Sequence, residues 1–189
     1  VREGFHFLTE PLKLAPEDSG THQYRVTYAA YPGENPVISG GRPISAWERE
    51  GPNGSLVADL PEVRDQNWRF SQLWTKDGDR LTRARHPNTG LLQIDSVPDL
   101  DPKAPYNVGQ ERFQYKPGDL QDYQDLADAQ IVLLHFWVSA RLPIQRIDEE
   151  NRMIELELKT RRKMTESGKD GTLAQYYIEN TLELMDFPG

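Results

Sequence analysis

The chain contains no cysteine, which excludes a disulfide framework, a thiol nucleophile and a thiolate metal site. It also lacks an apolar run close to the roughly 20 residues that a membrane-spanning helix needs. The longest apolar run, residues 131–138, contains His135 and is expected to form a buried strand. Basic residues are outnumbered by acidic ones: the chain has 22 lysines and arginines against 30 aspartates and glutamates, for a formal net charge of −8. This balance argues against nucleic-acid binding, since phosphate neutralisation needs a basic surface.

The familiar motifs of cofactor and metal sites are missing as well. There is no phosphate-binding glycine loop, no HExxH motif and no Cys/His zinc spacing. The four histidines are far apart in the sequence, and His135 is expected to be a core residue. We therefore expect no cofactor, with calcium at the acidic loop 17–21 as an alternative that would need about six oxygen ligands. An initiator methionine and a signal peptide are also missing, so we expect a piece cut from a longer chain.

Repeated β-rich units are present near the start of the chain. Residues 24–30 alternate apolar and polar side chains, the pattern of a half-buried strand, and Pro32-Gly33 predicts the turn into a second β-rich run at 36–39. A similar unit, residues 5–14 and the loop 16–21, begins about twenty residues earlier, as in one coil of a β-solenoid. These units predict the first coils of a parallel β-helix.

The remaining chain predicts antiparallel strands with little helix. Asp77-Gly78 lies between β-rich runs at 70–75 and 80–84, a strong hairpin signal that explains Asp77 by turn chemistry and not by catalysis. Asp119 is placed to cap a short helix through residue 126. Further strands are expected at 111–115, 129–137, 142–147 and 151–158. Residues 173–185 partly fit helical spacing, but a strand at 176–178 followed by a helical turn at 181–185 is favoured. This pattern predicts an inserted antiparallel β-sandwich or barrel-like module.

The predicted fold is therefore mainly β, with three regions. Residues 1–90 are expected to hold the β-helix-like coils and the hairpin, and residues 91–165 the inserted β module. Residues 166–189 are expected to return to the β-helix. The basic run at 161–163 is flanked by glutamates and is expected to be a solvated strand end or loop.

Aromatic side chains supply the one candidate binding chemistry. Tryptophans usually stabilise β-cores, but an exposed ring also packs against the C–H face of a sugar. Trp68 has the least core-like neighbours of the four tryptophans. The candidate carbohydrate-binding residues are Asn67, Trp68, Arg69 and Trp74.

Several stretches together resemble a known group of proteins. The chain begins with FHFLTEPLKLAPEDSGT and YRVTYAAYPGENPVISGG, followed by Ile44 and Trp47. These stretches resemble the N-terminal coils of bacterial right-handed parallel β-helix proteins related to glycoside hydrolase family 141. The hairpin, insertion module and return segment of that group are similar to LWTKDGDRLTRARHPN, FQYKPGDLQDYQDLADAQIVLLHFW and YYIENTLELMDFPG. The resemblance implies a secreted enzyme, extracellular or periplasmic, that acts on plant or algal polysaccharides and carries its catalytic carboxylates on later coils, beyond Gly189.

Three functions follow from these observations. The first is a non-catalytic N-terminal and insertion region of a β-helix glycoside hydrolase, which supports the remaining β-helix or positions a poly- or oligosaccharide. The second is a stand-alone carbohydrate-binding module. The third is a structural or protein-interaction domain, because uncovered strand edges invite association. No carboxylate pair of the kind that glycosidases use can be assigned, so this chain is expected to be inactive by itself.

Overall fold

The computed structural model describes residues 1–49, 51, 54–65, 67–120, 123, 126–135, 137–165 and 172–186. It is mainly β with very little helix, which confirms the predicted class. The helical elements are α1 (Pro61–Arg64) and the 3-10 turns η1 (Pro16–Asp18) and η3 (Leu182–Leu184). No helix in the described part of the chain is long and apolar enough to cross a bilayer.

The chain divides into two compact units. The first contains Val1–Arg49 and Leu56–Asp59, and the second contains Glu50–Ser55 and Leu60–Gly189. The region boundaries predicted at residues 90 and 165 remain predictions.

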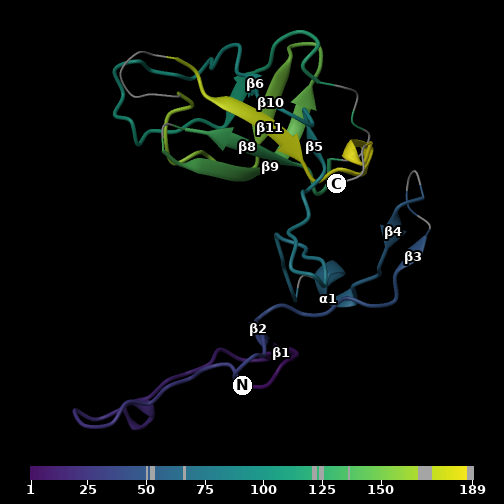
Figure 1. Ribbon diagram of the computed structural model, residues 1–189. Coiled ribbons are helices and arrows are strands. Elements are labelled where there is room, and N and C mark those ends of the chain that lie inside the picture. The colour runs from purple at the N-terminus through teal and green to yellow at the C-terminus, as the bar shows by residue number, and fades with distance from the viewer. Residues whose placement is uncertain are drawn as a thin grey trace. The chain divides into compact units, whose positions relative to one another are not determined.

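The first unit contains a parallel strand pair. Strand β1 (Phe5–Phe7) pairs in parallel with β2 (Val37–Ser39), with Phe5 opposite Val37 (Figure 1). Two further backbone hydrogen bonds extend the ladder, from the amide of Val37 to Gly4 and from the amide of Leu8 to Ser39. A short antiparallel pair follows, β3 (Glu48–Arg49) with β4 (Leu56–Val57).

The strand predicted at residues 24–30 is wrong. These residues form no strand, and Tyr24, Val26 and Tyr28 are 73%, 51% and 63% exposed. Strand β1 pairs directly with β2, and the amide of Thr21 turns back to the carbonyl of Tyr24. Alternation therefore predicted the wrong element here, because a strand also needs a neighbour that satisfies its backbone groups.

The second unit contains a seven-stranded antiparallel sheet (Figure 1). The order along the hydrogen bonds is β5-β11-β8-β9-β10-β7, and β6 also pairs with β11. The strands predicted in the insertion module and near the C-terminus are confirmed, with shifted ends. The strands are β5 (Arg85–His86), β6 (Leu92–Gln93), β7 (Arg112–Gln114), β8 (Gln130–Leu134), β9 (Ser139–Asp148), β10 (Met153–Leu156) and β11 (Gln175–Glu179).

Residues 92–96 join the two ends of this sheet. Strand β6 pairs with β11, and the amide of Ile94 continues the ladder to Ala174. Two residues further on, Ser96 forms an antiparallel bridge with Gln114 of β7. The hydrogen-bonded path therefore returns on itself, as in a small barrel.

The strands of the second unit surround a single hydrophobic core. Phe113 and Tyr176 are both fully buried, and their rings meet edge to face at a centroid distance of 5.0 Å. Residues that alternate along the strands complete the core, as a pleated sheet requires. They include Ile131, Leu133, Ile144, Ile154, Leu156 and Ile178, and the segments next to the strands add Ile94, Met164 and Ala174.

Two further predictions concern the Asp77-Gly78 hairpin and the helix at 119–126. The amide of Leu81 donates to Leu73, and the amide of Gly78 donates to Thr75, which confirms the Asp77-Gly78 hairpin turn. Its ladder is short, with one bridge between Trp74 and Arg80. The helix predicted at 119–126 lies largely outside the described residues.

Strand β9 changes partners along its length. Its first half, from Ser139 to Pro143, pairs with β8, and its second half, from Ile144 to Asp148, pairs with β10. The register shifts between Glu155 and Leu156 of β10, at the point of the exchange. This partner exchange bends β9 around the core and leaves one edge of its first half without a strand partner in the described part of the chain.

A buried carboxylate links four segments on the outer face of the sheet. Glu179 of β11 is 3% exposed and accepts hydrogen bonds from Arg83 Nη1 at 2.7 Å and from Arg141 Nε at 2.6 Å. Arg83 also donates to Gln130 of β8 at 3.3 Å. The bond from Arg141 to Glu179 raises the pKa of Arg141. Two cations therefore compensate the burial of this charge.

Replacing this carboxylate should destabilise the protein. Glu179→Gln leaves the two arginines without their anion, so we expect the free energy of unfolding to fall by about 2 kcal/mol, less than for fully buried pairs because both arginines reach solvent. Urea unfolding measures this change. Glu157→Gln, at an exposed position, is the matched control and should change it by less than about 0.5 kcal/mol. Equal effects of the two substitutions would contradict a structural role for the cluster.

Candidate functional site

A groove opens where the chain separates from strand β9. After Leu156, one more backbone bond joins Glu157 to Pro143, and the chain then turns toward Gln110. The amide of Thr160 donates to the Gln110 carbonyl at 3.0 Å. The space between the first half of β9 and residues 158–162 is consequently not filled by another strand.

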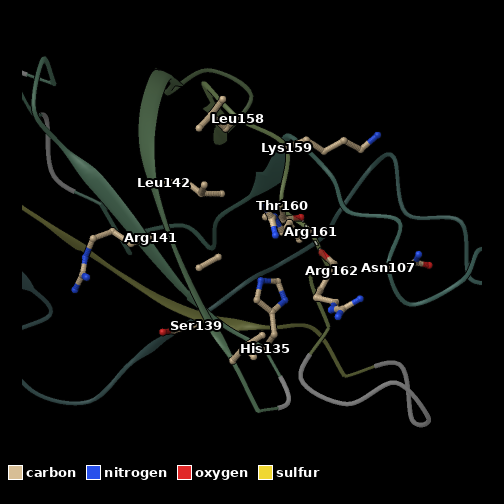
Figure 2. Close-up of a pocket in the computed structure, with 12 residues that line it drawn as sticks. Asn107, His135, Ser139, Arg141, Leu142, Leu158, Lys159, Thr160, Arg161 and Arg162 are labelled. Atoms are coloured by element: carbon tan, nitrogen blue, oxygen red, sulfur yellow. Dashed lines mark hydrogen bonds between the residues drawn. The ribbon is translucent and has the colours of Figure 1, made fainter. Parts of the chain in front are cut away.

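This groove, called the β9 groove below, has a volume of about 800 Å³. That size lies within the range of about 300–1,000 Å³ typical of ligand pockets. Figure 2 shows its two walls, with β9 on one side and the segment of Leu158 to Arg162 on the other. The lining side chains are Asn107, His135, Val138, Ser139, Ala140, Arg141, Leu142, Leu158, Lys159, Thr160, Arg161 and Arg162.

The lining residues that the structure describes combine cations with apolar groups, and no carboxylate is among them. Leu158 is 58% exposed and Val138 is 40% exposed, so apolar surface is open to solvent beside the charges. Figure 2 shows Arg162 extending beside the ring of His135, whereas Arg141 extends to the opposite side of β9. An arrangement of this kind is suited to an amphipathic or anionic ligand, and the described lining residues do not include the acid pair that glycoside hydrolysis requires.

The basic run at 161–163, part of which forms one wall, is more buried than the sequence predicts. Arg161 is exposed as predicted, but Lys163 is only 8% exposed and donates from Nζ to the Pro102 carbonyl at 3.0 Å. The prediction of a wholly solvated segment is therefore wrong for Lys163. The preceding Glu155 forms an ion pair with Arg146 at 2.7 Å instead of with this run.

Thr160 fixes the position of the basic wall. Its Oγ1 accepts from the Gln110 amide at 2.9 Å and donates to the Arg162 carbonyl at 2.8 Å. Gly109 packs so closely here that an added Cβ would overlap the Thr160 carbonyl. A glycine at 109 therefore allows the backbone contact that holds the groove wall.

A side chain at position 109 should disrupt this contact. Gly109→Ala places a methyl group on the Thr160 carbonyl, so we expect the free energy of unfolding to fall by about 2–3 kcal/mol. Urea unfolding provides the measurement. Gly40→Ala is the control, because a Cβ at Gly40 meets nothing within 4 Å. Wild-type stability of Gly109→Ala would show that the wall is not held in this way.

His135 lies at the base of the groove and is 6% exposed, as expected for a core histidine. Its Nδ1 lies 2.8 Å from the Lys163 carbonyl. A carbonyl oxygen accepts only, so Nδ1 carries the proton and Nε2 is an acceptor in the neutral ring. Nε2 is buried and has no hydrogen-bond partner in the described part of the chain. Burial lowers the pKa of His135, and the charge of Arg162 lowers it further, against the opposing effect of the Lys163 bond.

The lowered pKa predicts a pH-dependent stability. The unfolded chain binds a proton at His135 near pH 6.5, above the pKa of the folded protein, so stability is present above about pH 6.5 and is lost as pH falls toward the folded pKa. We expect the urea midpoint to decrease between about pH 7 and pH 5. His135→Gln should remove part of this decrease, whereas His22→Gln, at an exposed position, should retain it. Identical pH profiles for both variants would contradict the assignment.

An aromatic pair flanks the groove, the exposed Trp137 and the partly buried Tyr106. Trp137 is 67% exposed and precedes the lining residue Val138. Its ring lies 5.9 Å from that of Tyr106, and the guanidinium of Arg162 lies 5.6 Å from the Tyr106 ring. The sequence did not single out Trp137, because its neighbours are those of a buried strand.

The sequence-predicted binding residues lie on other elements. Asn67 and Trp68 follow α1, and both of their amides donate to the Glu62 carbonyl at 2.9 Å. The Trp68 ring is half-buried and stacks on Phe70 at 5.1 Å, and Arg69 is exposed. Trp74 lies in the following hairpin and is 54% exposed. None of these residues lines the β9 groove, and their role in binding remains a prediction.

In the acidic loop considered for calcium, residues 17–21, side-chain oxygens accept hydrogen bonds from nearby backbone amides. Asp18 accepts from the Ala15 amide at 2.8 Å, and Thr21 Oγ1 accepts from the Tyr24 amide at 3.1 Å. Within the described ranges, no cluster of three or more His, Cys, Asp or Glu side chains is arranged to hold a metal ion. The cofactor predictions remain untested.

Comparison with known proteins places this geometry in context. No protein-family model matches the sequence, and no curated protein matches it. A solved structure described as a glycoside hydrolase is similar to the chain, with a TM-score of 0.75 and 25% sequence identity. The fold is glycoside hydrolase-like. The similarity covers 100% of this chain and 32% of the solved one, so the glycoside hydrolase-like chain spans about a third of that protein's length. Membership of family 141 and a continuing parallel β-helix remain predictions.

Proposed function

We propose that this chain is a non-catalytic, substrate-positioning region of a polysaccharide-acting protein of the parallel β-helix glycoside hydrolase type. The observation that carries the proposal is the β9 groove, whose described residues offer cations, apolar side chains and a neighbouring tryptophan but no carboxylate. Glycosidases need two carboxyl groups about 5–10 Å apart, so this groove is suited to holding a sugar and not to cleaving it.

Two further observations support the proposal. The similarity to a glycoside hydrolase extends over the whole chain. The parallel ladder between β1 and β2 is the kind of pairing that consecutive coils of a β-helix use. In this proposal the first unit packs on the remaining β-helix of the parent, and the protein acts outside the cytoplasm on a plant or algal glycan.

Glycan binding by the isolated chain tests this proposal. We expect xylan or fucosylated oligosaccharides to change the intrinsic tryptophan fluorescence, and Trp137→Ala to weaken binding by about tenfold, because an exposed ring supplies a flat apolar surface for the sugar. Trp47→Ala, in the first unit, is the control and should bind as the wild type does. Trp68→Ala and Trp74→Ala show whether the sequence-predicted residues also contribute.

Two outcomes would overturn the proposal. Absence of binding to every glycan would remove the positioning role. Release of reducing sugar by the purified chain would show that a catalytic pair is present, contrary to the non-catalytic assignment.

A specific observation also favours a structural or protein-interaction role for the first unit. Its exposed apolar side chains include Phe5, Phe7, Tyr24, Val26 and Ile38. Exposed apolar surface of this kind marks contact sites. Light scattering of the isolated chain distinguishes this role, since a second copy on this surface would double the mass.

A further inference from the structure

The β9 groove carries more positive charge than the composition of the chain leads one to expect. The whole chain has a formal net charge of −8, yet Lys159, Arg161 and Arg162 follow one another along one wall. Within the described ranges, no carboxylate lies within ion-pair distance of these three side chains. The nearby Asp99 instead pairs with Arg112 at 2.7 Å. Among the described residues, the groove wall therefore presents three cations that have no close ion-pair partner.

Two buried polar atoms near the groove also lack a hydrogen-bond partner among the described residues. His135 Nε2 and the hydroxyl of Tyr106 are buried without a hydrogen-bond partner in the described part of the chain. A buried polar atom without a partner costs free energy that a suitable ligand recovers. The acceptor at His135 suits a hydroxyl donor, which sugars supply in abundance.

We propose that the β9 groove binds an anionic sugar unit, with Arg161 and Arg162 contacting its oxyanion and Leu158 and Val138 packing on the ring. The oxyanion is a uronate carboxylate or a sulfate ester, two groups with the same negative, oxygen-rich chemistry. Guanidinium groups suit both, because their planar N–H donors match paired oxygens. This inference rests on the proposed carbohydrate function and adds the charge class of the glycan.

Matched charged and neutral polymers test the inference with the full 189-residue chain. Polygalacturonate is compared with its methyl-esterified form, and dextran sulfate with dextran, by calorimetry at low salt. We expect at least one charged polymer to bind at least about tenfold more tightly than its neutral counterpart. Raising the salt concentration to about 0.5 M should weaken this binding, because exposed charges are screened. The charged polymer that binds identifies the source of the oxyanion.

Charge reversal locates the binding surface. Arg161→Glu should reduce binding of the charged polymer by about tenfold or more, whereas Arg25→Glu, the same change at an exposed position of the first unit, should reduce it by less than about twofold. Arg161 is exposed, so the unfolding midpoint should be retained, and Arg161→Gln replaces the variant if it is not. Equal losses for Arg161→Glu and Arg25→Glu would overturn the site, because binding would then follow net charge alone.

The remaining outcomes separate the two proposals. Equal affinity for charged and neutral polymers would overturn the inference and leave the carbohydrate function standing. Absence of binding to every glycan would overturn both. Polyglutamate serves as a non-sugar polyanion, and binding as tight as that of the charged glycan would overturn the inference, because an acidic peptide along the β9 edge would then be the ligand.

Discussion

The second unit depends on the hydrogen bonds that residues 92–96 make to two strands at once. This segment bonds to β11 through Ile94 and to β7 through Ser96, and it thereby joins the two ends of the sheet. An open sheet of this size would leave edge strands and one apolar face exposed. Closure instead allows Phe113, Tyr176 and the surrounding aliphatic side chains to be buried in one core. The first unit has no comparable core among its described residues, and its short strands leave many apolar side chains exposed.

The groove follows from the same geometry. Strand β9 bends around the core by exchanging β8 for β10, and β10 then separates from it after Leu156. The separating chain is held by Thr160 against Gln110 and Gly109, so the basic residues beyond it form a defined wall. The groove wall is therefore held by hydrogen bonds and close backbone packing, which suits a role in positioning a ligand.

Charge distribution also gives the groove its chemical character. Acidic residues outnumber basic ones in this chain, but two carboxylates close to the basic wall pair with other cations, Glu155 with Arg146 and Asp99 with Arg112. These bonds also lower the pKa values of both carboxyls, which keeps them ionised and engaged. The three cations of the wall form no ion pair with a described carboxylate and are therefore available to solvent or ligand. A net charge that disfavours nucleic acid is thus compatible with a local anion-binding surface.

The mainly β class, the Asp77-Gly78 turn and most strands of the second unit could be predicted from the sequence, because side-chain alternation and turn residues act over a few neighbouring positions. The sequence did not determine which strands pair, so residues 24–30 were wrongly assigned and the closing role of residues 92–96 was missed. The tertiary structure decided these features, since the pairing of Ser96 with Gln114 and the exposure of Trp137 depend on contacts with distant parts of the chain. It also decided the candidate site, because Arg161 and His135 become neighbours of one groove only after β9 and residues 158–162 are brought together around the core.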